Sequence, residues 1–468
     1  MHSRVIARLW YVYDWEACMR ISQELTLKRV WIFFAPLALS GLMMALGQPI
    51  VHAGLARLQD PEVTLAAYGL TFYAAVLLEA PIIMLLPAAN ALVSDKIAYY
   101  RTRRWMLIFN LILTINALVI SCITPLYDFI FMNLMGFPAD VARTAQPGLI
   151  VLVFWPAVIG IRRFYQGLVI RFGQTHWVGW GSAARLIAML ITIILGVKWF
   201  PHHGIIVGSA SLMAGVIADC VVAVIGAHRL LASGVLPAES PEALPASRQL
   251  RPFLNFFLPL AVTSCLMVLS RPLILSGIAR SHEPRLALAA WPVALGSMHL
   301  VSGQLQMIQQ AVVALVRDRS GLEVVKRFTI YAALCFFAIL ILLAVTPGAD
   351  YYHRVVIGLE EPILSMTNNA FRIMVFMPLL MAAQAWNQGM LIRAGRTMAV
   401  NFAAFANLIL VVSLVFLVAI TTRYGGHMIA ATFLPLALLG EVLLLARWAR
   451  PVIRDLVRKV PDATVTAD

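Results

Sequence analysis

Ionisable side chains inside long apolar stretches are the first feature of this 468-residue sequence that points to chemistry. A charge at the centre of a bilayer costs about 2.5–3.5 kcal/mol on insertion scales, so each such group needs a partner, water or a function. The group has five basic members and three acidic ones. They are Arg162, Arg163, Arg185, Arg271, Arg372, Glu79, Asp219 and Glu441. Arginine stays protonated and offers a planar fork to phosphate or carboxylate, so the basic excess favours anion binding.

Arg271 and Arg372 are the side chains that we expect to hold this anion. Arg271 directly precedes Pro272, and Arg372 lies near the middle of its apolar stretch. For Arg271 the alternatives are an ion pair or a cap on the carbonyl groups that Pro272 frees. Gln48 lies about 223 residues before Arg271 in a duplicated segment, and we expect its amide to add a neutral hydrogen bond to the same substrate.

The remaining arginines allow both structural and binding roles. Arg162 and Arg163 are consecutive, so on a helix they point about 100° apart and cannot both face one partner. We expect one of them to pair or to reach the interface, and we keep both as candidate substrate contacts. Arg185 and Asp219 lie on neighbouring apolar stretches, and an ion pair between them is the favoured interpretation.

The buried acids are candidates for a coupling-ion or proton site. Glu79 precedes Pro81 and has no obvious partner in the sequence, which makes it the first candidate. Asp219 and Glu441 are the others, and they occupy matching positions about 222 residues apart. His299 is interpreted as a hydrogen-bonded helix contact.

Composition assigns the chain to the polytopic membrane proteins. It is 61% hydrophobic and 12% charged, with a mean hydropathy of +0.85, whereas a soluble chain carries roughly twice that charge. The net charge of +14 is attributed to cytoplasmic loops, and nucleic-acid binding is not expected. The five cysteines form no C-x-x-C motif, and no hydrolase, zinc, P-loop or dinucleotide motif occurs. We therefore expect no enzyme activity, no metal and no cofactor.

A duplication organises the chain. The segment from Phe33 to Arg57 is repeated without a gap from Phe256 to Arg280, including the prolines at 49 and 272. These prolines are predicted to act as hinges in the first helix of each half. The Q-G-L-V-I-R-F-G-Q-T string from Gln166 answers Q-G-M-L-I-R-A-G-R-T about 222 residues later. Such internal symmetry is typical of transporters.

Hydrophobic stretches predict twelve membrane-spanning helices and thus an all-α fold. They are expected at 30–56, 64–94, 104–124, 142–171, 177–199, 205–230, 253–279, 285–316, 327–346, 362–393, 398–422 and 427–448. The domains are then an amphipathic N-terminal segment (1–29), an N-lobe (30–232), a linker (233–250), a C-lobe (251–450) and a tail (451–468). Six spans per lobe make the two lobes parallel and pseudosymmetric. Basic residues cluster on one side, which places both termini in the cytoplasm.

Short strings across the chain resemble a known family. Twelve spans in two parallel six-helix halves resemble the MATE-like multidrug/oligosaccharidyl-lipid/polysaccharide exporters. A-A-Y-G-L at Ala66–Leu70, S-R-P-L-I at Ser270–Ile274 and F-R-I-M-V-F-M-P at Phe371–Pro378 are similar to strings of the progressive ankylosis protein family. The resemblance implies efflux of pyrophosphate or related anions such as citrate. It carries over to Arg271 and Arg372, and it assigns no role to the other arginines or to His299.

These observations predict a secondary active transporter that exports a small anion by alternating access. The predicted partners are the small anionic substrate, the lipid bilayer and a coupling ion, and no oligomer is required. The expected location is the inner (plasma) membrane of a bacterium. Two alternatives stay open. One is a proton- or sodium-coupled MATE-like exporter of organic cations or drugs, and the other is a flippase for a lipid-linked substrate.

Overall fold

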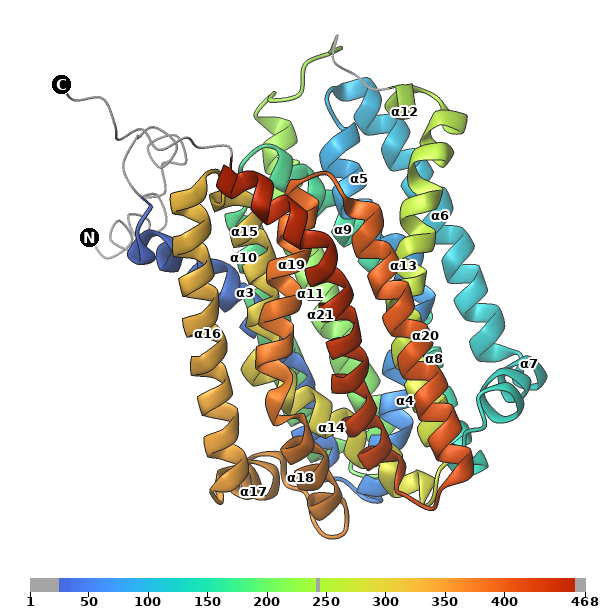
Figure 1. The fold of residues 1–468 in the computed structure, drawn as a ribbon. Coiled ribbons are helices and arrows are strands. Elements are labelled where there is room, and N and C mark those ends of the chain that lie inside the picture. Colours follow the sequence, from blue (N-terminus) through green and yellow to red (C-terminus); the bar gives the residue numbers. More distant parts are fainter. Residues whose placement is uncertain (1–24, 241–244, 459–468) are drawn as a thin grey trace, which may run out of the picture.

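The computed structural model describes residues 25–240 and 245–458 and shows an all-helical bundle (Figure 1). The segment predicted at 1–29 lies mostly outside the described residues, as does the end of the tail from 459. Within the described residues, eleven helices are long and apolar enough to cross a membrane. The count becomes twelve if α8 and α9, which meet at a 47° bend, form one span. The prediction of an all-α membrane protein is confirmed, with eleven to twelve candidate spans.

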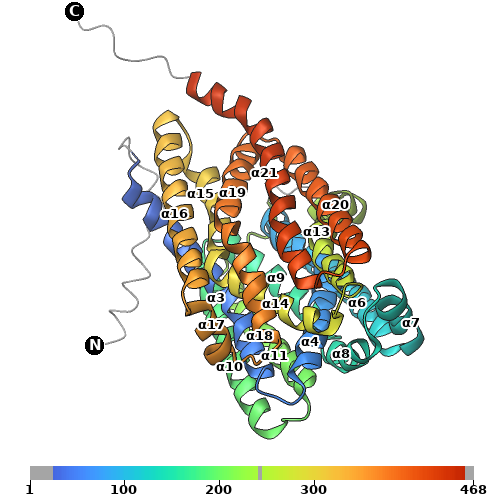
Figure 2. The same cartoon turned by 60° about the horizontal axis from the view of Figure 1, so that its bottom comes forward.

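The first half of the bundle, here the N-half, contains six spans. They are α3 (Leu27–Leu55); α4 (Pro61–Glu79) with η1 (Ala80–Met84) and α5 (Leu85–Leu92); α6 (Lys96–Cys122); α8 (Ala139–Val151) with α9 (Trp155–Arg171); α10 (His176–Trp199); and α11 (Gly204–Ala232). Two short helices, α7 (Thr124–Asp128) and the π-helix η2 (Phe129–Leu134), connect α6 to α8 and project beside the bundle (Figure 2).

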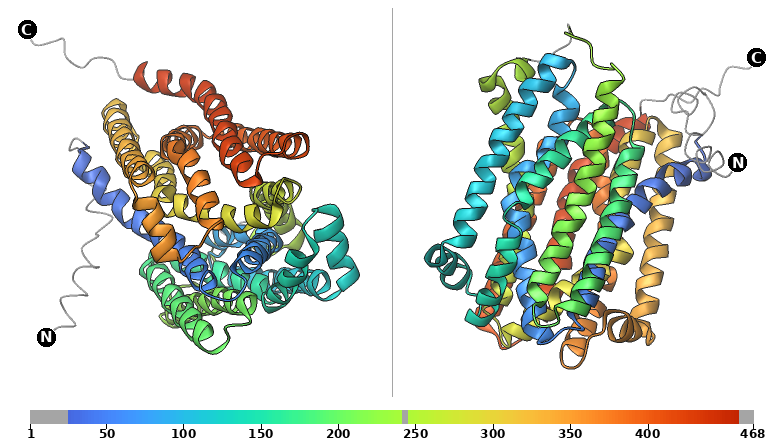
Figure 3. Two further views of the ribbon diagram at one scale, coloured as in Figure 1. Left: turned by 90° about the horizontal axis from the view of Figure 1, so that it is seen from below. Right: turned by 180° about the vertical axis from the view of Figure 1, so that it is seen from behind.

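The second half, the C-half, repeats this order. It contains α13 (Leu250–Ile278); α14 (Pro284–Ser302) with η3 (Gly303–Met307) and α15 (Ile308–Leu315); α16 (Arg319–Val345); α18 (Ile363–Ile373) with η5 (Met374–Phe376) and α19 (Met377–Arg393); α20 (Thr397–Thr421); and α21 (Gly426–Arg458). The short helices α17 (Gly348–Tyr351) and η4 (Tyr352–Ile357) correspond to α7 and η2, and α12 (Pro245–Arg248) lies in the linker. Seen along the bundle axis, the two halves lie side by side (Figure 3, left).

The duplication extends to backbone conformation. Asp60 and Glu283 both adopt a left-handed conformation, at φ 49° and 50°, immediately before a proline that begins the second span of its half. Proline suits the first turn of a helix because its missing N–H has no intrahelical partner there. The next spans also begin alike, because Asp95 and Asp318 each accept a backbone N–H of the first helical turn, at 2.8 and 2.7 Å.

Irregular backbone occurs at matching places in the two halves, but not at the predicted hinges. The helices α3 and α13 continue through Pro49 and Pro272. The second span of each half instead contains a tight 3₁₀ turn, η1 after Glu79 and η3 after Ser302. Such turns inside a helix often mark a place where the helix can bend. The hinge role of the two prolines therefore remains a prediction.

The first helix of each half also packs against the third span of the other half. Phe34 of α3 meets Phe328 of α16 with ring centroids 5.1 Å apart. In the equivalent contact, Phe253 of α13 lies 4.7 Å from Trp105 of α6. These ring pairs lie towards the side of the bundle that carries α12, here called the linker face. The opposite side, which carries α7 and α17, is called the far face (Figure 1).

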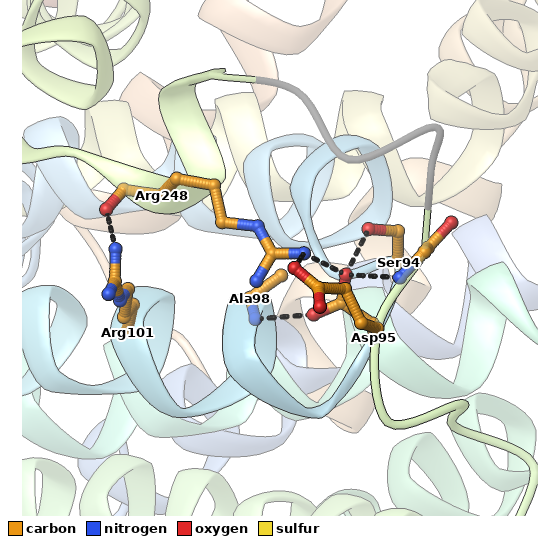
Figure 4. A network of polar contacts seen from close by, with 7 residues as sticks. Ser94, Asp95, Ala98, Arg101 and Arg248 are labelled. Carbon is orange, nitrogen blue, oxygen red and sulfur yellow. Dashed lines mark hydrogen bonds and ion pairs between the residues drawn. The ribbon is translucent and has the colours of Figure 1, made fainter.

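The linker is fixed to the N-half by a polar network on the linker face (Figure 4). Asp95, whose side chain is fully buried, forms an ion pair with Arg248 of α12 at 2.7 Å and accepts the backbone N–H of Ser240 at 3.0 Å. Arg101 of α6 donates to the carbonyl oxygen of Arg248. Burial acts to raise the pKa of Asp95, but the N–H groups of Ala98 and Ser240 and the Arg248 guanidinium outweigh it and lower that pKa.

Candidate functional site

A partly enclosed cavity, here called the main cavity, lies in the C-half against α4 of the N-half. Its volume is about 130 Å³, counted as the space open to the centre of a water molecule, which is room for several waters. The lining residues are Tyr73, Ser270, Arg271, Ile274, Trp291, Leu295, His299, Gln306, Met377, Met381, Gln384, Asn407, Leu434 and Leu438. Among these, Arg271 alone carries a permanent charge, so the cavity is apolar with one cation and several neutral polar groups.

The polar groups of this cavity come from both halves. Ser270 and Arg271 lie on α13, His299 on α14, Gln306 on η3, Gln384 on α19, Asn407 on α20 and Tyr73 on α4 of the N-half. The Nδ1 atom of His299 lies 2.9 Å from the carbonyl oxygen of Leu295, which is the local helix contact expected from the sequence. The rest of the imidazole is available to the cavity.

Glu441 lies immediately behind two of the cavity amides. Its carboxylate is buried, and it accepts hydrogen bonds from Gln384 at 2.9 Å, Gln388 at 3.1 Å and Asn407 at 2.5 Å. These three donors are neutral, and the ion pairs of the described chain do not include Glu441. The network fixes the orientation of Gln384 and Asn407, which line the cavity.

Asp219 is the matching acid of the N-half, and it is partnered differently. Arg162 donates to Asp219 at 2.5 Å, and Gln166 donates to its other oxygen at 3.2 Å. The arginine and the aspartate are both buried. The ion pair expected between Arg185 and Asp219 is therefore not formed, because Arg162 on α9 reaches Asp219 instead.

The two acid centres occupy equivalent positions of the repeat. With the offset of about 222 residues, Asp219 corresponds to Glu441, and Gln166 to Gln388. The same offset relates Arg162 to Gln384 and Arg185 to Asn407. Each half thus surrounds one buried carboxylate with the same set of helix positions. The N-half fills two of these positions with arginine, and the C-half fills them with amides.

Glu79 is the second acid near Asp219 in the N-half, and several arginines surround it. Its carboxylate lies within the electrostatic influence of Arg162, Arg163 and Arg185. Glu79 is 7% exposed, and its Oε2 atom has no hydrogen-bond partner. The side chains of Arg163 and Arg185 are half-buried. The structure therefore brings four predicted site residues, Arg162, Arg163, Glu79 and Asp219, into one cluster.

Gln48 and Arg372 lie outside the main cavity. The Gln48 side chain accepts the hydroxyl of Tyr68 at 3.1 Å, and its helix faces Gly296 of α14. Arg372 is exposed, and its Nε donates to the carbonyl oxygen of Ala344 at 3.3 Å. The expected grip of Arg271 and Arg372 on one anion is thus not formed here. The position of Arg372 along α18 suggested its depth in the membrane, but the helix turns its side chain outward.

On the far face, Arg57 joins the two halves. Arg57 follows the end of α3 and donates to the carbonyl oxygens of Val355, Val356 and Ile357, at 3.0, 3.0 and 2.8 Å. These carbonyls belong to the last turn of η4 in the C-half, where a helix leaves its C=O groups without partners. The negative end of the helix dipole also favours a cation at this place.

Arg280 makes the equivalent contact in the opposite direction. It follows α13 of the C-half and donates to the carbonyl oxygens of Leu134, at 2.5 Å, and Met135, at the end of η2 in the N-half. Gly136 and Gly358 end these two turns with φ of 74° and 89°. A Cβ atom at Gly136 would come within 2.8 Å of the Arg280 guanidinium carbon, so the contact needs glycine. We call these two contacts the arginine clasps.

Comparison with known proteins gives one family match. Residues 241–443 match the family model described as progressive ankylosis protein (ANKH). The match covers less than half of the chain. It agrees with the resemblance to that family seen in the sequence.

Solved structures show the same fold at low sequence identity. An inward-facing multidrug resistance MATE family transporter of the MOP superfamily matches with a TM-score of 0.66 and 16% identity, covering 91% of this chain and 100% of that chain. The lipid II flippase MurJ in an inward closed conformation matches with a TM-score of 0.66 and 13% identity, covering 91% and 90%. An outward-facing multidrug resistance MATE family transporter matches with a TM-score of 0.57 and 16% identity, covering 92% of this chain and 97% of that chain. The MATE-like fold is confirmed.

Proposed function

We propose that this protein is a secondary transporter that exports a small anion, such as pyrophosphate, citrate or a related phosphate or carboxylate. The observation that carries the proposal is the placement of Arg271 in the main cavity. A guanidinium in an apolar cavity attracts an anion and repels an organic cation. The family match over residues 241–443 supports a transport role, and the MATE-like fold supports alternating access.

The neutral lining residues give the anion its remaining contacts. Gln384 and Asn407 are held by Glu441, and Ser270, His299 and Gln306 offer further hydrogen-bonding groups. Arg271 and the Gln384 amide come from α13 and α19, so a bound anion would bridge two spans of the C-half. Tyr73 would close the site from the N-half.

In this proposal, the arginine clasps close the conformation towards the far face. Both clasps join the two halves at that side, so opening there requires Arg57 and Arg280 to release their carbonyl groups. A higher TM-score against the inward-facing MATE structure than against the outward-facing one supports this assignment. Clustered basic residues support a cytoplasmic linker face, with both termini in the cytoplasm of a bacterium.

The test is anion flux and binding in purified, reconstituted protein with Arg271 changed. Arg271→Gln should weaken pyrophosphate or citrate binding by roughly ten- to a hundredfold, because a hydrogen bond to a charged group is worth about 1.5–3 kcal/mol. The anion affinity of Arg271→Lys should lie between those of wild type and Arg271→Gln, because lysine keeps the charge but lacks the planar guanidinium group. The matched control is Arg251→Gln, which removes an exposed arginine from the same helix.

The same assay separates the alternatives. Unchanged anion flux in Arg271→Gln would contradict the proposal. Competition by a cationic dye, with no competition by pyrophosphate or citrate, would favour the organic-cation exporter. A bound lipid-linked substrate would favour the flippase. Arg372→Gln should bind the anion with near wild-type affinity, because Arg372 lies outside the cavity.

A further inference from the structure

The N-half contains a second charged cluster that the cavity around Arg271 does not include. Its members are Arg162, Arg163, Arg185, Glu79 and Asp219. Three guanidinium groups and two carboxylates leave one uncompensated positive charge. Burying an unbalanced charge is costly, so such a cluster needs a further negative partner.

Asp219 neutralises only one of these arginines. It is bound to Arg162 at 2.5 Å, and Gln166 occupies its other oxygen at 3.2 Å. Both partners of this ion pair are buried, and the contact is fixed from α9 and α11. Arg163 and Arg185 make no ion pair with Asp219 among the described contacts, and Glu79 is the second acid whose charge acts on them.

The hydrogen-bonding groups of the cluster are also unbalanced in favour of donors. The Nε atoms of Arg162 and Arg163 and the Nε1 atom of Trp155 are buried donors without a partner. Arg162 is 4% exposed, and Trp155 acts on Glu79 together with the arginines. The unpartnered acceptor beside them is Glu79 Oε2. An oxyanion supplies several acceptors and a negative charge at once, which is what this cluster lacks.

The C-half shows that these charges are not required by the fold. The positions equivalent to Arg162, Arg163 and Arg185 hold Gln384, Ala385 and Asn407, and the position equivalent to Glu79 holds Ser302. The C-half keeps the buried acid with neutral partners. The extra charges of the N-half are therefore a property of that half alone.

We infer that Arg163 and Arg185 form a second site for a small oxyanion, and that Glu79 takes up one proton when the anion binds. The ionised carboxylate of Glu79 and the anion compete for the same two guanidinium groups. A proton from water placed on Glu79 removes this competition and leaves both arginines for the anion. The inference deepens the proposed function, because it names a site where proton and anion binding are linked.

The groups around Glu79 support this linkage. The charges of Arg162 and Arg163 on α9 and of Arg185 on α10 act on Glu79. From the C-half, α13 packs against the turn that follows Glu79, where the Ser264 hydroxyl donates to the carbonyl oxygen of Ala80 at 2.5 Å. Ser264 is neutral, so the described charges that decide the protonation of Glu79 are the arginines and, through them, Asp219.

The test uses sulfate, whose charge does not change between pH 6 and pH 8. Sulfate is titrated calorimetrically into the purified full-length Arg271→Gln protein, so that the cavity site is disabled, in two buffers of different ionisation enthalpy. The expected result is binding with uptake of up to one proton. Linkage then makes the affinity rise by up to tenfold for each pH unit that the pH falls.

Three further variants separate the roles of the cluster residues. Glu79→Gln, added to Arg271→Gln, should keep high affinity but lose both the proton uptake and the pH dependence. Arg163→Gln or Arg185→Gln should weaken sulfate binding at least tenfold, and neither side chain makes a hydrogen bond that folding requires in the described structure. The matched control is Glu62→Gln, which removes an acid from the first turn of the same helix, α4, and should keep the pH dependence.

Two outcomes would overturn the inference. One is the absence of sulfate binding in the Arg271→Gln protein. The other is an unchanged pH dependence in the protein that also carries Glu79→Gln. A failure of the proposed function is a separate result, because it appears as unchanged pyrophosphate flux in Arg271→Gln whatever sulfate does at the N-half cluster.

Discussion

At the level of residues, the two halves stabilise an equivalent buried carboxylate with different partners. Each half surrounds one buried carboxylate, Asp219 or Glu441, with three equivalent helix positions. Asp219 is balanced by an arginine, whereas Glu441 is held by three amides. A buried ion pair is costly to break, because removing one partner leaves the other charge uncompensated. The N-half centre should therefore depend on its partners more strongly than the C-half centre does.

The first prediction concerns the ion pair between Arg162 and Asp219. Arg162→Ala should destabilise the protein by about 3 kcal/mol, because it leaves Asp219 buried and unpaired. Arg162→Gln combined with Asp219→Asn should recover most of this loss, because the two neutral amides can hydrogen-bond and no buried charge is left without a partner. Thermal unfolding of the purified protein in detergent checks both variants. A single variant as stable as wild type would show that water or another group already compensates Asp219.

Charged candidate site residues are easier to recognise in the sequence than neutral ones. Arg271 stands out because a charge in an apolar stretch is rare. Gln384 and Asn407 do not stand out, because amides are tolerated in helices that pack inside a bundle. The repeat could have identified them. The offset of about 222 residues that relates Gln166 to Gln388 also relates Gln384 and Asn407 to arginines of the N-half. Arg372, which we expect from the sequence to hold the anion with Arg271, lies outside the main cavity, because helix depth does not determine which face a side chain takes.

At the level of elements, the linker is docked on the N-half by a polar contact. Asp95 begins α6 as its N-cap and also binds Arg248 of α12, so one side chain both stabilises a helix and docks the linker. Its repeat partner Asp318 caps α16 through Gly321 at 2.7 Å. The two aspartates differ in that only the first, among the interactions described, carries an ion pair.

The second prediction uses this matched pair. Asp318→Ala should cost about 1 kcal/mol, the usual value of an N-cap. Asp95→Ala should cost about 1–2 kcal/mol more, because the ion pair with Arg248 is lost too. Asparagine can still cap, so Asp95→Asn should lose the ion-pair contribution alone and Asp318→Asn should be nearly neutral. Equal losses for Asp95→Ala and Asp318→Ala, measured by thermal unfolding, would contradict a stabilising role for the linker contact.

The third prediction gives the pH dependence of that contact. The folded-state pKa of Asp95 is lowered from its ordinary value of 3.8. A group of this kind contributes stability above the unfolded-state pKa, and the contribution is lost as the pH falls through the folded-state pKa. Wild type and Asp95→Asn should therefore differ in stability at neutral pH and converge in acid below pH 3.8. A constant difference across this range would contradict the assignment.

The fourth prediction concerns the arginine clasps. Arg57→Gln with Arg280→Gln should populate conformations that are open at the far face, because no guanidinium then holds the last turns of η2 and η4. Spin labels at Phe129 and Tyr351, in a background without the five native cysteines, would report a broader and longer distance distribution. Arg143→Gln is the control, since Arg143 pairs with Asp128 inside the N-half. An unchanged distribution in the double variant would contradict a closing role for the clasps.

At the level of the whole molecule, the fold could be predicted because two signals agree. Twelve apolar stretches of bilayer length define the spans, and their boundaries lie mostly within a few residues of the observed helices. The duplication then restricts how two sets of six helices can be arranged. The breaks at η1, η3 and η5 were not predicted, because a 3₁₀ turn within an apolar span leaves little trace in hydrophobicity. The crossing of α3 to α16 depends on tertiary contacts between distant aromatic residues, which local patterns do not contain.

The fifth prediction addresses orientation in the membrane. Ser233→Cys lies in the linker and Pro201→Cys lies in the turn between α10 and α11, on opposite faces and both exposed. A membrane-impermeant maleimide added to intact cells should label Pro201→Cys, and it should label Ser233→Cys only after permeabilisation. The opposite pattern would place the linker face outside.

The arginine clasps have a consequence for how the two halves recognise each other. Each half supplies one guanidinium and receives one through the same pair of structural features, so the contact is isologous, as in a twofold-symmetric homodimer. The chain is in this respect a fused dimer whose subunits have diverged in charge but kept their mutual docking surface. If the chain is divided within residues 241–244, the two fragments would therefore carry complementary contact surfaces. When they are coexpressed, they should associate without a covalent connection.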